Sequence, residues 1–288
     1  MISAPKTVLC IHDLPGFGRA SLSVIIPVLS ALGVQAVALP TAVLSTHTGG
    51  LGTPARMSNP GYGPAALAHY KRLGIRFDCI YSGYLADAGQ AHLVQQALEL
   101  WPDALAIVDP VLGDHGKLYS GLSEDMIPAM RSLCARAGLI LPNPTEAALL
   151  LDETPSAAPT LESVSQQAAR LTALCPRVVV TGVRAGQRSI ACIGAQRDGH
   201  GFVTRSSFIP RLYHGTGDIF GAVVAGRMMQ GNVTEAAVQT AAAFVVECIR
   251  ATPEGADERL GVWLEAALPL LSADREEPLS PVRGGYPE

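Results

Sequence analysis

The chain has 288 residues, of which 48% are apolar and 16% charged, and its 21 basic and 25 acidic groups give a formal net charge of -4. A chain of this length and apolar content buries roughly three quarters of its unfolded surface, which excludes an intrinsically disordered protein and a small disulfide scaffold. The slightly acidic balance lacks the basic excess of a protein that neutralises many phosphates, so we expect no nucleic-acid partner.

The cysteines and the N-terminus favour a cytoplasmic protein. The 6 cysteines form no CxxC pair and no Cys/His spacing suited to zinc, so we expect small buried side chains. The N-terminal residues lack the pattern of a secretory signal. Residues 20–55 carry no charged side chain, but Pro27, Gly33 and Pro40 interrupt them. We therefore expect a helix and a buried strand there, and no membrane span.

In chain order, short β-branched segments alternate with longer amphipathic ones. The segments predicted as strands are 6–12, 34–39, 79–82, 105–109, 139–141 and 177–181. The helices predicted between them are 22–32, 62–73, 88–100, 123–137 and 161–174. An antiparallel hairpin is then predicted from 188–194 and 201–207, followed by helices at 218–229, 233–251 and 258–271.

This alternation predicts an α/β fold with a mostly parallel sheet, helices on both faces and an antiparallel edge hairpin. Ligands are expected at the carboxyl ends of the strands. No linker divides the first part of the chain, so we expect one domain over 1–271 and an unpacked polar tail over 272–288.

The first candidate motif is GFGRAS, residues 16–21, between a predicted strand and a predicted helix. It falls short of a dinucleotide fingerprint, because Ser21 replaces the third glycine and no acid occurs between Asp13 and Asp78. A tight turn is therefore a better interpretation than an NAD site. Such a turn can still place Asp13 and Gly16 against a substrate at the sheet edge.

The second motif is GTGD, which an apolar helix follows at once. Gly215, Thr216 and Gly217 leave unpaired backbone N–H groups at the helix start, and together with the helix dipole these form an anion hole for a phosphate. Asp218 lies in the first turn, where capping or dipole complementation is an alternative explanation. The chain contains no Walker sequence, so any nucleotide is held by another device.

Two further segments carry acids at predicted strand ends. In VDPVLGDHGKLY, Asp109 closes a buried strand and Asp114 follows in the loop, and paired carboxylates suit a hydrated Mg²⁺ carried on nucleotide phosphates. An ordinary polar loop is the alternative. In NPTEAALLL, Asn143 and Glu146 form the pattern of a capping box, which alone explains both residues.

Two neutral loops complete the set. STHTGG contains His47 and Thr48, and YSGY ends at Tyr84. Either loop is a candidate for substrate contact or simply a turn. His47 fits a structural histidine better than a catalyst.

In this order over nearly the whole chain, GTGD, DPVLGD, THTG and SGYL resemble the ribokinase-like superfamily, and within it the pyridoxal or pyridoxamine kinase branch. The resemblance implies a three-layer α/β/α sandwich and ATP-dependent phosphorylation of the 5'-hydroxymethyl group of a B6 vitamer. It also implies that Asp218 is the base and that the backbone of 215–217 receives the phosphoryl group.

The same resemblance assigns the remaining residues. It implies that Thr48 and Tyr84 contact the pyridine ring. The implied residues around Mg²⁺ and the nucleotide are Asp109, Asp114, Glu146, Asn143, Tyr119 and Thr181. Apart from the resemblance, the chemistry of phosphoryl transfer suggests Lys117 as a mobile cation beside the nucleotide. Asp13 replaces the family's usual serine, which favours an amine-bearing ring such as pyridoxamine or a different alcohol. We expect a homodimer, and a monovalent cation requirement stays open.

Two rival functions remain at this point. One is a related kinase for hydroxymethylpyrimidine or a sugar, and the other is a non-catalytic ligand-binding protein on the same fold. The complete GTGD motif with Asp218 argues against the second.

Overall fold

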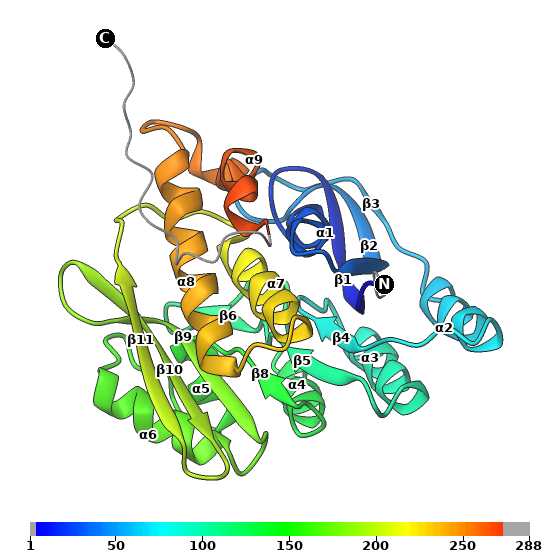
Figure 1. Ribbon diagram of the computed structural model, residues 1–288, viewed down its shortest axis with the longest axis horizontal. Coiled ribbons are helices and arrows are strands. Elements are labelled where there is room, and N and C mark those ends of the chain that lie inside the picture. The colour runs from blue at the N-terminus through cyan, green and yellow to red at the C-terminus, as the bar shows by residue number, and fades with distance from the viewer. Residues whose placement is uncertain (1–3, 273–288) are drawn as a thin grey trace.

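The protein is described here by a computed structural model, which covers residues 4–272 (Figure 1). Residues 273–288 of the predicted polar tail lie outside the described residues. No helix within residues 4–272 is both long enough and apolar enough to cross a membrane.

One large sheet runs through the described part of the chain, with six parallel strands at its centre and antiparallel strands at its edges. In spatial order the strands are β11 (Gly201–Ser207), β10 (Ser189–Gln196), β9 (Arg177–Arg184), β8 (Leu139–Ile140), β5 (Leu105–Val108), β4 (Cys79–Ser82), β1 (Thr7–Phe17), β2 (Gln35–Thr46) and β3 (Arg56–Met57). The predicted mostly parallel sheet and its edge hairpin are therefore confirmed.

Helices cover both faces of the sheet (Figure 1). One face carries α1 (Leu22–Ala31), α7 (Thr216–Met229), α8 (Thr234–Ala251) and α9 (Leu264–Ala267). The other carries α2 (Tyr62–Arg72), α3 (Ala88–Leu100), α4 (Met126–Cys134), α5 (Pro144–Leu150) and α6 (Leu161–Leu171). Strand β1 supplies alternate side chains to the two cores, Val8 and Cys10 to one and Leu9 and Ile11 to the other. All six cysteines are buried and free, as predicted.

The order of the strands creates a crevice between β1 and β4. The connection from β1 to β2 runs through α1 on one face, whereas α3 leaves β4 on the opposite face. At such a switch point the loops diverge, and ligands bind at the carboxyl ends of the strands. Strands β1 and β2 continue past this edge, and their register shifts between His12 and Leu14. This bulge lies at Asp13, and bulges next to active sites re-aim side chains.

Two predictions of local structure differ from the fold. The single helix predicted over 258–271 is wrong: the segment consists of a 3₁₀ turn (Glu258–Leu260), α9 and a second 3₁₀ turn (Leu268–Leu271). Gly261 interrupts it with a φ of 78°, a left-handed conformation that ends a helix. A small hairpin of β6 (Gly113–Asp114) and β7 (Lys117–Leu118) also forms in the loop that carries the predicted acids.

Candidate active site

The start of α7 is open. Its N-cap, Gly215, has a φ of 80° and provides no side chain to cap the helix. The backbone N–H groups of Thr216, Gly217 and Asp218 donate no hydrogen bond to any group within residues 4–272. A Cβ at Gly215 would lie 2.0 Å from the carbonyl oxygen of Arg19, so only glycine allows this close approach. The result is a set of free donors at the positive end of a helix, which suits an anion.

Asp218 does not cap its own helix. Its Oδ2 accepts a hydrogen bond of 2.8 Å from the backbone N–H of Ser21 at the start of α1. The side-chain hydroxyl of Ser21 donates to Oδ1 of Asp13 at 2.6 Å. Ser21 therefore connects the two carboxylates, and it does so with a φ of 50°, a strained conformation for a non-glycine residue.

The environment of these acids makes them weaker acids than usual. Burial raises the pKa of Asp218 to about 7, against the opposing effect of the Ser21 hydrogen bond, and the charge of Asp13 raises it further. Burial likewise raises the pKa of Asp13. A carboxylate whose pKa lies near neutral pH is well placed to accept a proton as a general base.

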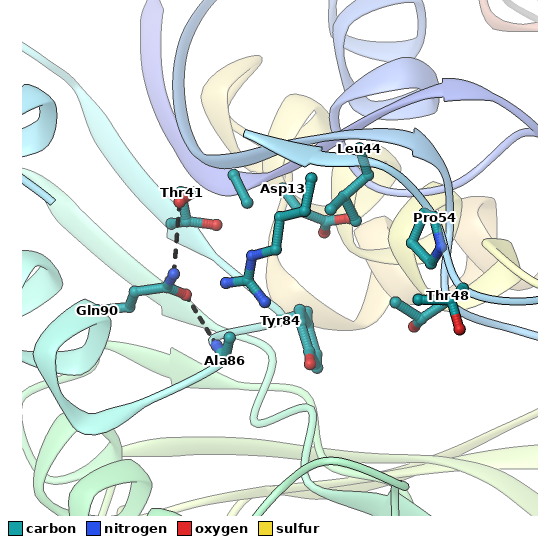
Figure 2. Close-up of a pocket in the computed structure, with 11 residues that line it drawn as sticks. Asp13, Thr41, Leu44, Thr48, Pro54, Tyr84, Ala86 and Gln90 are labelled. Carbon is teal, nitrogen blue, oxygen red and sulfur yellow. Dashed lines mark hydrogen bonds between the residues drawn. The ribbon is translucent and has the colours of Figure 1, made fainter. Parts of the chain in front are cut away.

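A pocket of about 270 Å³ opens at the carboxyl ends of β1, β2 and β4 (Figure 2). Asp13, Thr48 and Tyr84 all line it, so three of the predicted substrate residues converge on one cavity. Gln90 fastens the far wall, because its side-chain carbonyl accepts from the N–H of Ala86 and its amide donates to the carbonyl of Thr41. A pocket of this size suits a small substituted ring rather than a nucleotide.

A second acidic group lies beside the start of α7. A Cβ on Gly217 would lie 4.0 Å from Oδ2 of Asp109, so this carboxylate faces the open helix end. Burial and the charge of Asp218 raise the pKa of Asp109. Glu146 is 3% exposed, and burial together with the charge of Asp109 raises its pKa as well. Three acids therefore share one electrostatic environment, and a cation there would relieve their repulsion.

Glu146 and Asn143 form the capping box that their spacing predicts. Both oxygens of Glu146 are engaged, Oε1 by the N–H of Leu112 and Oε2 by the N–H of Asn143. The side-chain amide of Asn143 also donates to the carbonyl of Gly113 at 2.7 Å. These contacts fasten the β6–β7 hairpin to the start of α5.

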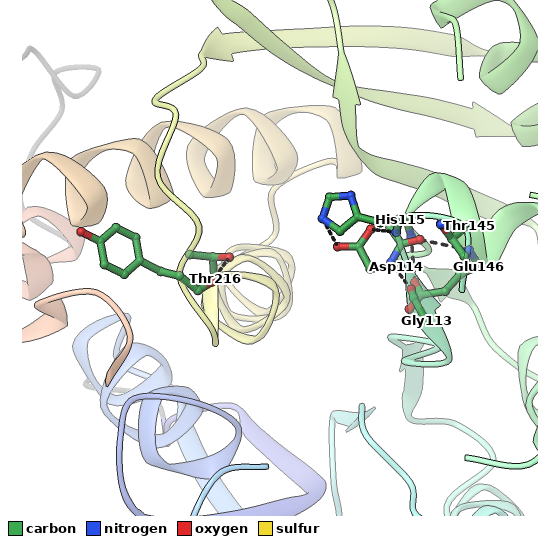
Figure 3. Close-up of polar contacts among 9 residues, drawn as sticks. Gly113, Asp114, His115, Thr145, Glu146 and Thr216 are labelled. Atoms are coloured by element: carbon green, nitrogen blue, oxygen red, sulfur yellow. Dashed lines mark hydrogen bonds and ion pairs between the residues drawn. The ribbon is translucent and has the colours of Figure 1, made fainter. Parts of the chain in front are cut away.

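The β6–β7 hairpin carries the remaining nucleotide predictions. Asp114 accepts from the N–H of its neighbour His115, so its carboxylate turns along the hairpin (Figure 3). Lys117 is exposed, and Tyr119 is 40% exposed with a pKa raised by burial and then by surrounding acids, Glu146 first among them. Within residues 4–272, no three ligating side chains cluster as a metal site. The predicted set of Asp109, Asp114 and Glu146 is therefore not assembled around one point.

Three other predicted residues lie outside the pocket. His47 is 5% exposed and both ring nitrogens are engaged, Nε2 by the carbonyl of Arg259 and Nδ1 by the N–H of Gly49. This supports the structural interpretation of His47. Gly16 packs against the backbone of β2, and Thr181 joins β9 to the segment after β8 through the carbonyl of Pro142.

Sequence reasoning missed Ser21 and Arg56. In GFGRAS, Ser21 stands where a dinucleotide fingerprint has its third glycine, yet a serine directly before an apolar helix is also an ordinary N-cap signal. Arg56 lines the pocket and is the first charged residue after the uncharged stretch 20–55. A charged residue that ends so long an uncharged stretch is the sequence signal that could have identified Arg56 as a site residue.

Comparisons with known proteins agree with this geometry. Residues 26–262 match the model of the phosphomethylpyrimidine kinase family. The pyridoxine/pyridoxal/pyridoxamine kinase of Bordetella bronchiseptica is 29% identical over 274 residues, covering 87% of this chain and 90% of the relative.

Two solved structures are similar along nearly their whole length. The pyridoxal kinase of Lactobacillus plantarum is 35% identical, covers 92% of this chain and 96% of its own, and has a TM-score of 0.85. A Bacteroides thetaiotaomicron structure, described as a phosphomethylpyrimidine kinase and solved with pyridoxal, is also 35% identical, covers 95% of this chain and 98% of its own, and has a TM-score of 0.88. The expected three-layer fold is thereby confirmed.

Proposed function

Because the chain belongs to the phosphomethylpyrimidine kinase family, we propose that it transfers the γ-phosphoryl group of ATP to the 5'-hydroxymethyl group of a B6 vitamer. Pyridoxal, pyridoxamine and pyridoxine are the candidate acceptors. The names of the similar kinases and the pyridoxal-bound neighbour support this assignment.

Asp218 is the proposed base. Phosphoryl transfer needs an attacking oxygen in line with the phosphorus and a group that accepts its proton. Asp218 is partly exposed and carries a pKa of about 7. The Ser21 N–H holds one carboxylate oxygen, which leaves the other available for a hydroxyl group.

The N-terminus of α7 is the proposed cradle for the transferred phosphoryl group. Its free N–H donors are fixed by the helix and need no rearrangement when negative charge develops, which is the condition under which such donors stabilise a transition state most. Because Asp218 belongs to the same helical turn, base and cradle are fixed relative to each other.

Magnesium fits the acidic side of this site. The carboxylate of Asp109 accepts no hydrogen bond from residues 4–272, and Mg²⁺ typically takes one or two carboxylates together with water and substrate phosphates. We propose that Asp109 holds the ion and that Glu146 supports it through its remaining lone pairs. When bound, the ion supplies positive charge against the phosphates.

The observation that carries the proposal is the bridge through Ser21. It joins the floor of the substrate pocket, at Asp13, to the proposed base, Asp218, within two hydrogen bonds. A small alcohol in the pocket is therefore held beside a base and a phosphate cradle at once.

The test is a substrate panel. The purified protein is incubated with ATP and Mg²⁺ and with each of pyridoxal, pyridoxamine, pyridoxine, hydroxymethylpyrimidine and ribose, while ADP release is measured. We expect the vitamers to give the highest kcat/KM. The family match favours hydroxymethylpyrimidine as a second candidate, and faster turnover of that alcohol would replace the vitamer assignment. Tight binding of an alcohol without ADP release would instead favour a non-catalytic binding protein.

Two further expectations stay predictions. A homodimer is consistent with the exposed apolar side chains of Phe17 and Met57, which are 60% and 66% exposed on the extended ends of the sheet. Light scattering on the purified protein tests it. A cytoplasmic location is tested by cell fractionation.

A further inference from the structure

The pocket holds one positive and one negative side chain among otherwise uncharged walls. Asp13 lies on its floor and is 5% exposed, and Arg56 reaches it from the edge strand β3. The other lining residues are apolar, threonine, tyrosine or glutamine. The other titratable side chains near this corner are Asp87 beside Tyr84, His47, and Asp218, which Ser21 joins to Asp13.

The side chain of Arg56 has no bonding partner among the described residues. Its exposed guanidinium group forms no ion pair and donates no hydrogen bond to any group within residues 4–272, whereas the pocket side chains of Asp13 and Gln90 are both hydrogen-bonded. Its strand is only two residues long and pairs with β2 at the pocket rim, where Arg56 lies opposite Leu44 and Met57 lies opposite Val43. Asp13 and Tyr84 both lie within its electrostatic reach. An arginine without a partner at a pocket wall is suited to an anionic oxygen of a ligand.

We infer that Arg56 is a specificity-determining residue that binds the ionised 3-hydroxyl group of the substrate ring. This inference rests on the proposed function. The vitamers carry a ring nitrogen, a 3-hydroxyl and a 5-hydroxymethyl group at alternate ring positions, and a 3-hydroxypyridine ionises to a form with a positive nitrogen and a negative oxygen. Such a ring matches the opposite charges of the pocket, with its nitrogen at Asp13 and its oxygen at Arg56. Its third arm then points to Asp218, which Ser21 joins to Asp13.

The same arrangement discriminates between alcohols. An aminopyrimidine alcohol has no acidic ring hydroxyl, so it gives Arg56 no anion to bind and loses the charge-assisted hydrogen bond that a hydroxypyridine gains. The pocket therefore favours a hydroxypyridine over a pyrimidine.

The test compares two ligands on three proteins. Pyridoxine and 3-deoxypyridoxine are titrated calorimetrically, without nucleotide, into the wild type, Arg56→Met and Arg56→Lys. In the wild type we expect pyridoxine to bind about tenfold more tightly than its 3-deoxy analogue, because a charge-assisted hydrogen bond contributes about that much. Arg56→Met removes this difference and Arg56→Lys keeps part of it. Arg72→Met, an exposed arginine on α2, is the matched control and keeps the full difference.

A spectroscopic readout separates this role from a structural one. The near-ultraviolet absorbance of bound pyridoxine reports whether the 3-hydroxyl is ionised, and we expect its transition at a higher pH in Arg56→Met than in the wild type. Equal binding of the two ligands by the wild type, or a preference that survives in Arg56→Met, overturns the inference. The proposed function is judged separately, by ADP release: it fails if no vitamer supports ADP release or if hydroxymethylpyrimidine is turned over faster than the vitamers. Absence of both vitamer binding and vitamer turnover overturns the inference and the proposed function together.

Discussion

Helices α5 and α7 begin in the same way and end up with different tasks. Each starts after a loop at the carboxyl edge of the sheet, and each carries an acid at its third position, Glu146 in α5 and Asp218 in α7. In α5 the N-cap is Asn143, and the acid reaches back to the N-cap N–H. In α7 the N-cap is Gly215, and the acid reaches away to Ser21.

The N-cap residue explains the difference. Asn143 supplies an oxygen to the helix start, so the donors of α5 are satisfied from within and Glu146 completes the box. Gly215 supplies nothing, so the donors of α7 remain free for an external anion. An acid at the third position of a helix is therefore a cap where a polar N-cap precedes it, and an available carboxylate where glycine does.

The largest expected effect comes from Asp218→Asn. Loss of the base should lower kcat for ADP release by about 10² to 10⁴, with substrate binding largely kept, because the amide still accepts from Ser21 but takes no proton. Asp103→Asn, at an exposed turn, is the matched control. A variant with near wild-type turnover would remove Asp218 from the mechanism.

Gly215→Ala should unfold most easily of the structural variants. The new Cβ combines a left-handed φ of 80° with a backbone oxygen at 2.0 Å, so we expect a loss of about 3 kcal/mol in the free energy of unfolding. Urea denaturation measures it. Gly231→Ala has a similar φ of 91° but open space, and should lose about 1 kcal/mol. Equal losses in the two variants would show that the contact with Arg19 is unimportant.

Activity should fall in acid with the protonation of Asp218. Its pKa of about 7 predicts that kcat/KM drops about tenfold for each pH unit below that value, because only the ionised carboxylate accepts a proton. The same raised pKa lowers the free energy of unfolding as the pH rises from 3.8 toward 7. In this range Asp218 is already ionised in the unfolded chain but still protonated in the folded protein, so rising pH favours the unfolded chain. Asp218→Asn should therefore be more stable than the wild type at pH 8 and lose that advantage below pH 4. If the residual kcat/KM of Asp218→Asn fell in acid at the same pH as that of the wild type, the fall would belong to another group.

The smallest expected effect concerns the capped helix. Asn143→Ala should cost about 1 kcal/mol of stability and raise KM for ATP severalfold, because it breaks the cap and also releases the β6–β7 hairpin at Gly113. Thr160→Ala removes the equivalent cap of α6, which has no hairpin attached, and should change stability alone. Similar KM values for ATP in the two variants would show that the β6–β7 hairpin does not contribute to nucleotide binding.

The sequence predicts the elements well because they follow hydrophobic periodicity. Helix α3 has the predicted bounds, and the edge hairpin forms where polar turn residues separate two β-branched segments. The prediction of a single helix over 258–271 was wrong because Gly261 and Pro269 interrupt a segment whose hydrophobic periodicity is continuous.

The site was predictable only in part, for a physical reason. Asp13, Thr48 and Tyr84 converge because parallel strands end at one edge, which chain order reveals. The bridge through Ser21 depends on the contact between α1 and α7, and the position of Arg56 depends on an antiparallel pairing of only two residues. The local signals of Ser21 and Arg56, an N-cap serine and the first charge after an uncharged stretch, mark the residues but do not show which partners they meet.

The corner around Arg19 depends on a late part of the chain. Its N–H donates to the carbonyl of Leu260, its own carbonyl lies against Gly215, and Arg259 next door accepts from His47. During synthesis, every strand of the large sheet has been made once residue 207 has emerged. The N–H of Arg19 and the ring of His47 gain their carbonyl partners only when residues 259 and 260 follow. The strands of the sheet are thus complete well before the reaction centre. A chain that ended after α8 would keep every strand, but it would lose both the segment that closes the Arg19 corner and the buried side chains of Val262, Leu264, Ala267 and Leu271 that cover part of one face.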